Sequence, residues 1–416
     1  MLWSHESDVL VVGAGPAGLT AALMLAERGV TVEVIDEDPM TESRNHAVML
    51  HPATLAMLDE LSVTVTAELI RQGTKIPKIA FYDREVPRAT VDVAALDGPH
   101  PYLLVLPHHG LESALTARLE ELRVPIRRSH RLSRIEHDGD HVACTIEQLG
   151  DDSGGYSVAG TLLVVDKELH TKPKFVIGAD GFHSVVRRRL DIGFEPSGEA
   201  QGYAPTEFRT RFDLGGEMRV ILDHERGAVT FPLPDGGCRF TASLVPGEIP
   251  PADSHYIPVG TRSHPAQPPE VFLRNLRGLA PWFEEPKPDI TWAARVRFEP
   301  GLATRFGMGR VWLVGDAAHV TGPIGVQSLN LGMSEARDLS GRIADVLGGG
   351  PASVLDRYHY ERTDEWRALL GLRAGLVPKP EADPWVAQMA PRLLACIPAT
   401  GGDLEKLASQ LGLGLA

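Results

Sequence analysis

The sequence is poor in the features that mark secreted, membrane-spanning and metal-binding proteins. Its 416 residues include only three cysteines, which follow no metal-ligand pattern, so we expect reduced thiols and no bound metal at Cys144, Cys238 and Cys396. No run of 18 apolar residues occurs, which argues against a transmembrane helix and a membrane partner. The N-terminus lacks the basic start and long apolar stretch of a signal peptide, so a cytoplasmic location is expected.

Positive charge is also scarce. Lysine and arginine total 41 against 55 aspartates and glutamates, which gives a net charge of −14. A surface of that sign repels a phosphate backbone, so nucleic acid is not an expected partner. The composition, 43% hydrophobic and 23% charged, is that of an ordinary globular chain with enough apolar residues for a large core.

The clearest positive signal is a glycine-rich loop near the N-terminus. Gly13-Ala-Gly-Pro-Ala-Gly18 follows the apolar segment Val9–Val12 and opens a stretch, Leu19–Arg28, with the apolar spacing of a helix. A second apolar segment, Val32–Ile35, leads to Asp36. This order of strand, glycine turn, helix, strand and acidic residue predicts a Rossmann-like dinucleotide-binding unit.

The positions of this loop have distinct physical roles. Gly13 permits a tight turn, Gly15 lets the backbone approach a pyrophosphate, and Gly18 lets the helix pack against the strand. The start of the helix, which includes Ala17, offers N–H groups and a positive dipole to the phosphates. Asp36 can accept hydrogen bonds from ribose hydroxyls and disfavours a 2′-phosphate, so the loop indicates FAD or NAD rather than NADP.

Two later segments distinguish between these nucleotides. Gly178-Ala-Asp-Gly-Phe-His-Ser-Val-Val-Arg187 and Arg310-Val-Trp-Leu-Val-Gly-Asp-Ala-Ala-His319 resemble the Asp-Gly and Gly-Asp segments of flavoprotein aromatic hydroxylases related to para-hydroxybenzoate hydroxylase, the group A flavoprotein monooxygenases. With the glycine loop, they follow that family's order and rough spacing. The resemblance runs from about residue 7 to residue 365 and includes Leu355-Asp-Arg-Tyr-His-Tyr-Glu-Arg362. It implies a tightly bound FAD.

The resemblance also implies roles for individual residues. Asp316 would accept a hydrogen bond from a ribityl hydroxyl, and Asp180 would support the backbone near the pyrophosphate. Pro323 would line the space above the reactive edge of the flavin. Backbone N–H groups of Leu329 and Asn330 would face its pyrimidine end, where the helix dipole stabilises reduced flavin. The resemblance also places Gly181 and Ala318 among the cofactor-binding residues and Gly325 among the catalytic residues. Pro323 is expected to belong to both groups.

Four positions depart from the family pattern. His46 stands where the family usually has arginine, with Arg44 two residues earlier, and His108 stands where glutamine is usual. Ser328 replaces a glycine before the flavin helix, and Glu335 replaces an aspartate within that helix. We expect Arg44, His46 and His108 to contact the cofactor and His46 to be catalytic; the alternative is that both histidines are ordinary surface residues.

The implied reaction is that of a single-component monooxygenase. NAD(P)H, bound transiently, would reduce FAD, and O2 would then form a flavin C4a-hydroperoxide that hydroxylates a phenolic or polyketide-like small molecule. No separate NAD(P)H domain is visible, so NADH and NADPH both stay open. The catalytic base is not identified; candidates in the predicted inserted sheet are Arg209, Arg211, Arg219 and His224.

Other interpretations stay open at this point. A Baeyer–Villiger oxygenase or an epoxidase would use the same hydroperoxide, and a flavin-binding redox sensor without turnover would carry the same cofactor motifs. The absence of a Trp-x-Trp-x-Ile-Pro segment argues against a flavin halogenase. The sequence does not choose between a monomer and a homodimer.

The predicted fold is α/β, with a discontinuous FAD-binding Rossmann-like domain of the glutathione reductase type, an inserted antiparallel β-sheet domain and a helical C-terminal region. We expect the FAD-binding domain in residues 1–80, 100–190 and 300–350, the substrate sheet in 81–99 and 191–299, and the helical region in 351–416. Helices are expected around 55–69, 109–122 and 330–347. Short alternating segments between 200 and 300 predict a half-buried sheet, and the proline-rich stretch 243–270 an exposed loop.

Overall fold

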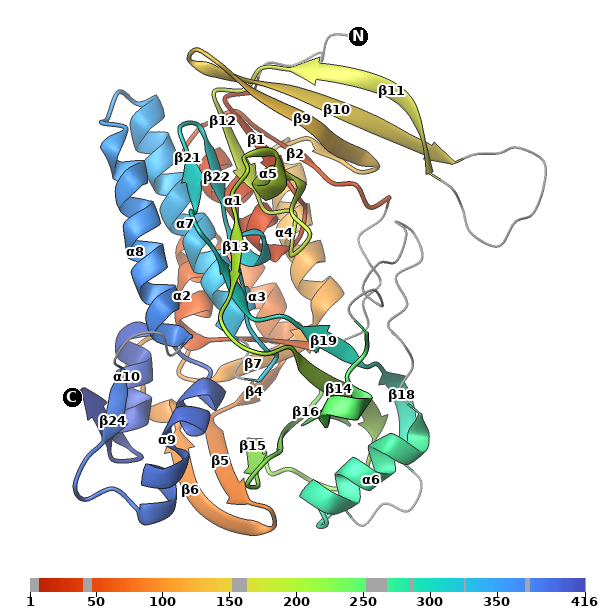
Figure 1. Ribbon diagram of the computed structural model, residues 1–416, viewed down its shortest axis with the longest axis vertical. Coiled ribbons are helices and arrows are strands. Elements are labelled where there is room, and N and C mark those ends of the chain that lie inside the picture. The colour runs from red at the N-terminus through yellow and green to blue at the C-terminus, as the bar shows by residue number, and fades with distance from the viewer. Residues whose placement is uncertain are drawn as a thin grey trace.

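A mainly parallel sheet forms the centre of the molecule (Figure 1). The computed structural model describes residues 7–39, 47–151, 163–251, 268–283, 288–324, 327–370 and 375–415. The central sheet has the order β21-β22-β12-β1-β2-β8, with bounds Gly307–Met308, Val311–Leu313, Phe175–Gly178, Val9–Val12, Val32–Ile35 and Ile126–Arg127. Its pairings are parallel except for β21 with β22. The residues of β1, β12 and β22 are buried, as a covered parallel sheet requires, whereas β8 and β21 at the two edges are only partly buried.

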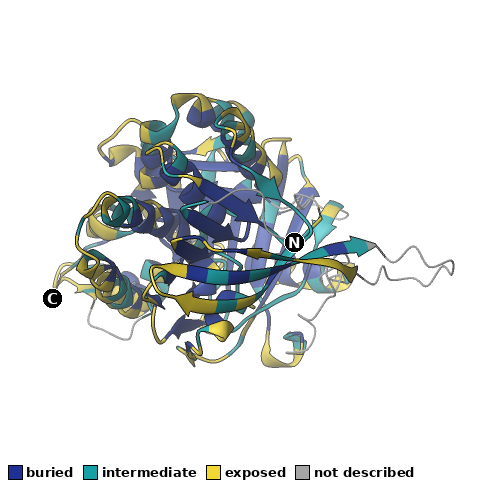
Figure 2. Ribbon diagram, turned by 90° about the horizontal axis from the view of Figure 1, so that it is seen from above, coloured by how far each residue is buried: buried dark blue, intermediate teal, exposed yellow. Residues whose placement is uncertain are grey.

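Helices and a second sheet pack around this centre. Helices α1 (Pro16–Ala26) and α4 (His108–Glu121) lie together, α7 (Gln327–Leu347) packs on α1, and α8 (Ser353–Leu369) packs on α7. An antiparallel sheet of β9, β10 and β11 contacts β2 and β12 and contributes buried side chains to the same core. Its bounds are His130–Asp138, His141–Asp151 and Leu163–Thr171. Figure 2 shows the buried interior of the molecule and the exposed residues of this sheet.

The inserted sheet has the order β18-β14-β17-β16-β15-β5-β6, and β19 also pairs with β14. The bounds in that order are Asp289–Ala293, Gln201–Arg209, Gly237–Ser243, Gly227–Pro232, Glu217–Leu222, Lys78–Asp83, Val86–Asp92 and, for β19, Val296–Phe298. All pairs are antiparallel except β5 with β15, which is parallel. Helix α6 (Pro269–Leu279) packs against the sheet through Phe272 and Leu276.

Smaller elements connect these layers. A three-stranded sheet β3-β7-β4 (Ala47–Leu50, Leu103–Pro107, Thr74–Ile76) lies between the central and inserted sheets (Figure 1) and is accompanied by α2 (Pro52–Leu61) and α3 (Val63–Gln72). Another joins β13 (Phe194–Pro196), β20 (Gly301–Ala303) and β23 (His319–Val320), and α5 spans Val185–Arg189. Among the residues that the structure describes, one-turn 3-10 helices span Val93–Ala95, Pro246–Glu248 and Gly315–Ala317.

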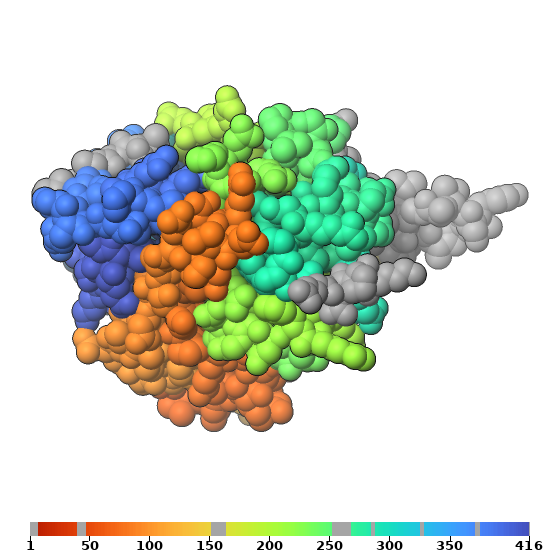
Figure 3. All heavy atoms as spheres, turned by 90° about the horizontal axis from the view of Figure 1, so that it is seen from below, coloured from red at the N-terminus to blue at the C-terminus, as the bar shows by residue number. Residues whose placement is uncertain are grey.

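The C-terminal region packs beside the inserted sheet. Helices α9 (Pro384–Cys396) and α10 (Gly401–Ser409) share an apolar cluster with β5, β6, β15 and β16. Seen from below, the C-terminal segments, residues near β5 and β6, and α6 lie next to one another (Figure 3). The region also contains an antiparallel pair, β24 (Leu376–Pro378) with β25 (Leu413–Leu415).

The predicted fold class is confirmed, with local corrections. The helix expected around 55–69 is two helices, because Ser62 ends α2 and caps α3 by accepting from the Val65 N–H at 3.5 Å. The inserted sheet is more deeply buried than predicted, since α6 and the C-terminal helices cover it. It is also not purely antiparallel. No helix within the described residues is long and apolar enough to span a membrane.

Candidate active site

The glycine loop joins β1 to α1 in a conformation that requires two of its glycines. Gly13 has a φ of +107°, and a Cβ there would lie 2.2 Å from the carbonyl oxygen of Ala179. A Cβ on Gly18 would lie 1.9 Å from the Gly13 oxygen, so only glycine allows the helix to approach the loop this closely. A Cβ on Gly15 meets nothing within 4 Å. The space in front of α1 is therefore open.

The start of α1 offers donors to an anion in that space. Gly15 is the N-cap residue and provides no side-chain cap, and proline occupies the first turn. The N–H groups of the first helical turn have no partner within a helix, and no side chain of the described part of the chain caps them. Ala17 and Gly18 lie in this turn. These residues fit a dinucleotide pyrophosphate, which would bind where the helix dipole is positive.

Asp36 lies at the end of β2, beside the same loop. Its Oδ2 accepts a hydrogen bond from the Ala14 N–H at 2.6 Å, and its Oδ1 accepts from the Asp38 N–H at 2.8 Å. The Arg128 guanidinium approaches the carboxylate at 3.7 Å. Asp36 thus holds the loop itself, a role that the sequence did not indicate, and it stays at the position expected for a ribose contact.

The Asp-Gly segment forms a network around Asp180. The Ser184 hydroxyl donates to Oδ1 of Asp180 at 2.6 Å, and the N–H groups of Val185 and Val186 donate to Oδ2 at 2.7 and 3.0 Å. Burial raises the pKa of Asp180, and these hydrogen bonds partly oppose the rise. Gly181, with a φ of +75°, makes the turn that brings this segment together.

Arg187 joins the two flavin motifs. Its buried guanidinium donates to the carbonyl oxygens of Phe182 at 2.8 Å and Ala317 at 2.7 Å, and it lies 4.6 Å from the ring centre of Phe194. The carbonyl of Ala317 belongs to the turn that carries Asp316, just before Ala318. The Asp-Gly and Gly-Asp segments, far apart in the sequence, are therefore fixed to each other by one side chain.

Behind the Gly-Asp turn lies a buried cluster centred on Glu335. Its Oε2 accepts from the Gly315 N–H at 2.9 Å and contacts Nε2 of His319 at 2.7 Å, while its Oε1 accepts from the indole N–H of Trp366 at 2.6 Å. The rings of His319 and Trp366 stack at 3.7 Å. Glu335 thus links the Gly-Asp turn to Trp366 of α8.

The start of α7 is tied to both the turn and β3. The Ser328 hydroxyl donates to Oδ1 of Asp316 at 2.7 Å. The Asn330 side chain donates to the Met49 carbonyl at 2.9 Å and accepts from the His51 N–H at 2.8 Å. The side chain of Asn330 is thus structural, whereas its N–H and that of Leu329 stay in the first turn of α7, where a helix dipole favours negative charge.

The proline loop faces the inserted sheet. A Cβ on Gly322, next to Pro323, would lie 2.9 Å from the Tyr203 hydroxyl oxygen and 3.0 Å from the Gln201 side-chain oxygen. The Tyr203 hydroxyl donates to Gln201 at 2.7 Å, and burial raises the pKa of Tyr203 to about 12. The loop expected above the flavin edge therefore meets polar groups of β14.

Not all predicted site residues can be placed. Arg44, His46 and Gly325 lie outside the described residues. His108 begins α4 and is buried, with its Nδ1 3.6 Å from Glu112 Oε1. It is therefore not the surface histidine of the alternative interpretation. Pro107 pairs with Ala47, the first residue of β3. His108, the residue after Pro107, therefore lies beside the start of β3.

The four candidate bases on the inserted sheet lie away from the proline loop. Arg209 and Arg211 are exposed, and Arg209 lies 4.0 Å from Asp289. Arg219 pairs with Glu217 at 2.7 Å and is surrounded by the rings of Tyr82, Phe212 and Trp282, whose centres lie 5.3 to 5.6 Å away. His224 is an exposed turn residue.

Sequence reasoning missed three buried residues of this sheet: Tyr203, Glu207 and Arg239. The alternation that predicted the strands gives two opposite faces but not which face meets the cofactor domain. Glu207 and Arg239 stand at the more polar of the two alternating sets of positions in their strands, so the sequence offered no signal that they are enclosed.

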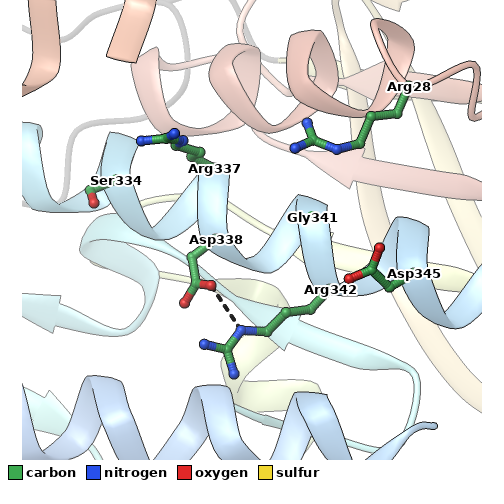
Figure 4. A pocket seen from close by; sticks show the side chains of 7 residues that line it. All are labelled: Arg28, Ser334, Arg337, Asp338, Gly341, Arg342 and Asp345. Atoms are coloured by element: carbon green, nitrogen blue, oxygen red, sulfur yellow. Dashed lines mark hydrogen bonds and ion pairs between the residues drawn. The ribbon is translucent and has the colours of Figure 1, made fainter. Parts of the chain in front are cut away.

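A surface groove between two helices lies apart from this site. A groove of about 370 Å³ lies between α1 and α7 and is lined by Arg28, Ser334, Arg337, Asp338, Gly341, Arg342 and Asp345 (Figure 4). Its guanidinium groups have internal partners: Arg342 pairs with Asp338 at 2.8 Å, Arg337 bonds Glu60, and Arg28 donates to the Met24 carbonyl at 3.2 Å. The groove therefore has the character of a solvated surface.

Known proteins resemble this chain over most of its length. A family model described as FAD binding domain matches residues 6–371. A 12-dehydrotetracycline 5-monooxygenase/anhydrotetracycline 6-monooxygenase of Streptomyces rimosus subsp. rimosus is 30% identical over 370 residues, which are 85% of this chain and 66% of that protein. Pentachlorophenol 4-monooxygenase of Sphingobium chlorophenolicum is 27% identical over 379 residues, 88% of this chain and 64% of that protein. The chain thus spans slightly less than two thirds of these relatives.

The fold of this chain also resembles that of a solved structure. The crystal structure of p-nitrophenol 4-monooxygenase from Pseudomonas putida DLL-E4 superposes with a TM-score of 0.72 at 24% identity, covering 98% of this chain and 96% of that one. The matched family model spans the glycine loop, the Asp-Gly segment and the Gly-Asp turn. These three motifs follow the carboxyl ends of β1, β12 and β22, which are neighbours in the central sheet. The chain therefore belongs to the family that carries this FAD binding domain, and FAD is its cofactor.

Proposed function

We propose that this protein is a single-component, FAD-dependent monooxygenase that hydroxylates a phenolic or polyketide-like aromatic small molecule with NAD(P)H and O2. Bound FAD would supply hydride acceptance from NAD(P)H and activation of O2. The chain's own task is then to hold the flavin, exclude water and orient the aromatic ring.

The observation that carries the proposal is the contact between the proline loop and the inserted sheet. Gly322, beside Pro323, lies against Tyr203 and Gln201 of β14. The expected reactive edge of the flavin and a wall with polar side chains therefore lie side by side. A flavin sensor without turnover would need no such wall. The relatives are named for aromatic substrates, whose polar groups could bind to polar side chains of this kind.

Residues on three sides would bind and orient the cofactor. The start of α1 and the turn after β12 would hold the pyrophosphate, and Asp36 the ribose. Asp316 would hold the ribityl chain. The first turn of α7 would orient the flavin ring and favour its negative reduced form through the helix dipole. Tyr203, which keeps its proton at neutral pH, would contact the substrate as a neutral hydroxyl.

The test is a sequence of spectra on the purified protein. FAD should be bound, and anaerobic NADH or NADPH should bleach its band near ~450 nm, faster in the presence of a phenol. Aerobic turnover with a phenol should then give a product that is heavier by one oxygen atom when a C–H position is hydroxylated. With p-nitrophenol, oxygenation at the carbon that carries the nitro group should instead release nitrite and give benzoquinone. A ring-expanded or epoxidised product would support the oxygen-insertion alternatives, and bleaching without any product would support the sensor.

A further inference from the structure

The inner face of the inserted sheet is divided into an apolar and a polar half. Successive strand residues point to opposite faces, and the register pairs Glu207 of β14 with Arg239 of β17. On β15 and β16 the inner face is apolar and packs against α9 through residues such as Val220 and Phe231. On β14 and β17 it carries Tyr203, Glu207 and Arg239. This polar half meets the cofactor domain.

Glu207 and Arg239 hold one residue of that domain from both sides. Oε1 of Glu207 accepts from the Ala47 N–H at 2.8 Å, and Nη1 of Arg239 donates to the Ala47 carbonyl at 2.6 Å. The two side chains lie 3.3 Å apart and are only 7% and 11% exposed. The Arg239 guanidinium also lies 5.4 Å from the ring centre of Trp292. Burial raises the pKa of Glu207 and lowers that of Arg239, and their mutual attraction opposes both shifts.

The grip on Ala47 has a counterpart further along the same strand. β3 is the edge strand of its small sheet, so it has backbone groups that no neighbouring strand satisfies. Asn330, at the start of α7, binds the Met49 carbonyl and the His51 N–H. Positions 47, 49 and 51 alternate along the chain. The inserted sheet therefore holds this segment at Ala47, and the start of α7 holds it at Met49 and His51.

A buried charge pair is a poor way to stabilise an interface, because desolvation of two charges offsets most of their attraction. Apolar side chains of similar size are often as stable, and the other half of this face uses them. We propose that Glu207 and Arg239 are positioning residues: they fix the inserted sheet relative to β3 and, through Asn330, relative to the start of α7. The substrate held on the sheet then stays aligned with the flavin edge. This inference rests on the proposed hydroxylase function.

The test is the double variant Glu207→Leu/Arg239→Met, which removes the grip without leaving a buried unpaired charge. We expect its melting temperature to fall, since the buried N–H and carbonyl groups of Ala47 lose their partners. Its FAD affinity should stay within about 2-fold of the wild type, because neither residue belongs to a cofactor motif. Amide hydrogen exchange in β3 of the holoenzyme should accelerate at least 10-fold. With p-nitrophenol as the probe, product formed per NADPH consumed should fall at least 5-fold, with the remainder appearing as H2O2.

A matched control is Glu217→Leu/Arg219→Met, an ion pair of the same sheet that contacts the outer aromatic side chains. It should leave β3 exchange and the product yield unchanged. A Glu207/Arg239 variant with wild-type product yield, or with unchanged β3 exchange, overturns the positioning role. If the wild type itself gives no product from p-nitrophenol or other phenols, the proposed function fails and the inference falls with it.

Discussion

The Ser328 hydroxyl lies 2.7 Å from Oδ1 of Asp316 and donates a hydrogen bond to that carboxylate. The contact joins the first turn of α7 to the Gly-Asp turn. The bond uses one carboxylate oxygen and fixes the plane of the group. Within the described residues, Oδ2 of Asp316 accepts no hydrogen bond. The bond between Ser328 and Oδ1 also fixes the direction in which Oδ2 points.

We expect Ser328→Ala to weaken FAD binding about 5-fold. The variant loses a hydrogen bond that orients the ligand's acceptor, which is worth about 1 kcal/mol. Isothermal titration of apoprotein with FAD measures the effect. Ser334→Ala, an exposed serine of the same helix, is the control and should bind normally. Unchanged affinity in Ser328→Ala would show that the carboxylate is oriented without the serine.

Gly15→Val should separate cofactor binding from folding. A Cβ at position 15 meets nothing within 4 Å among the described residues, so the apoprotein should fold with a nearly unchanged circular dichroism spectrum. The valine would instead fill the space before α1, and FAD should no longer copurify. Gly13→Ala makes the contrast, because its Cβ would collide with Ala179 and its φ is positive, so this variant should be poorly folded. A Gly15→Val holoenzyme with full flavin content would contradict the pyrophosphate assignment.

Arg187→Met should lower the free energy of unfolding by about 3 kcal/mol, since two carbonyls lose a charged donor inside the protein. Urea denaturation of the apoprotein measures this. FAD affinity should fall as well, because the turn that contains Asp316 and Ala317 loses its link to the Asp-Gly segment. Arg188→Met changes an exposed neighbour and should have little effect on either quantity. Equal stability of the two variants would argue against the link.

The protein should lose stability at alkaline pH. Burial raises the pKa of Cys144, Cys238 and Cys396 from 9.0 to about 12, and that of Tyr203 from 10.0 to about 12. Between pH 9 and 12 the unfolded chain releases protons that the folded chain retains, so stability falls as pH rises. The melting temperature should therefore decrease steadily above pH 9. Replacing the three cysteines with alanine should reduce that slope, and an identical slope would contradict the assignment.

Local sequence patterns predicted the first elements of the cofactor domain. The strand, the glycine turn and the helix of residues 9–28 lie where their apolar spacing indicated, because each element is decided by interactions within a few residues. The family, the fold class and FAD are confirmed by the match over residues 6–371. The role of individual site residues stays a prediction until variants are measured.

The substrate side was predicted less well, and the reason is geometric. Alternation in β14 and β17 correctly indicates strands, but both faces of this sheet are covered, one by α6 and the other by the C-terminal helices and β3. An arginine such as Arg219 and one such as Arg239 then look alike in the sequence. Only the packing of each face shows that Arg219 lies among aromatic rings and Arg239 against Ala47.

The sequence by itself determined that this chain binds a dinucleotide cofactor, because turn glycines, helix starts and strand ends are local requirements. The tertiary structure alone decided which distant residues complete the site. Arg187 reaches Ala317, Glu335 reaches Trp366, and Glu207 reaches Ala47 across 160 positions of chain. Such contacts form only when whole sheets and helices pack together. The free energy of that packing comes from the entire core, so it is not evident from either residue or its neighbours in the sequence.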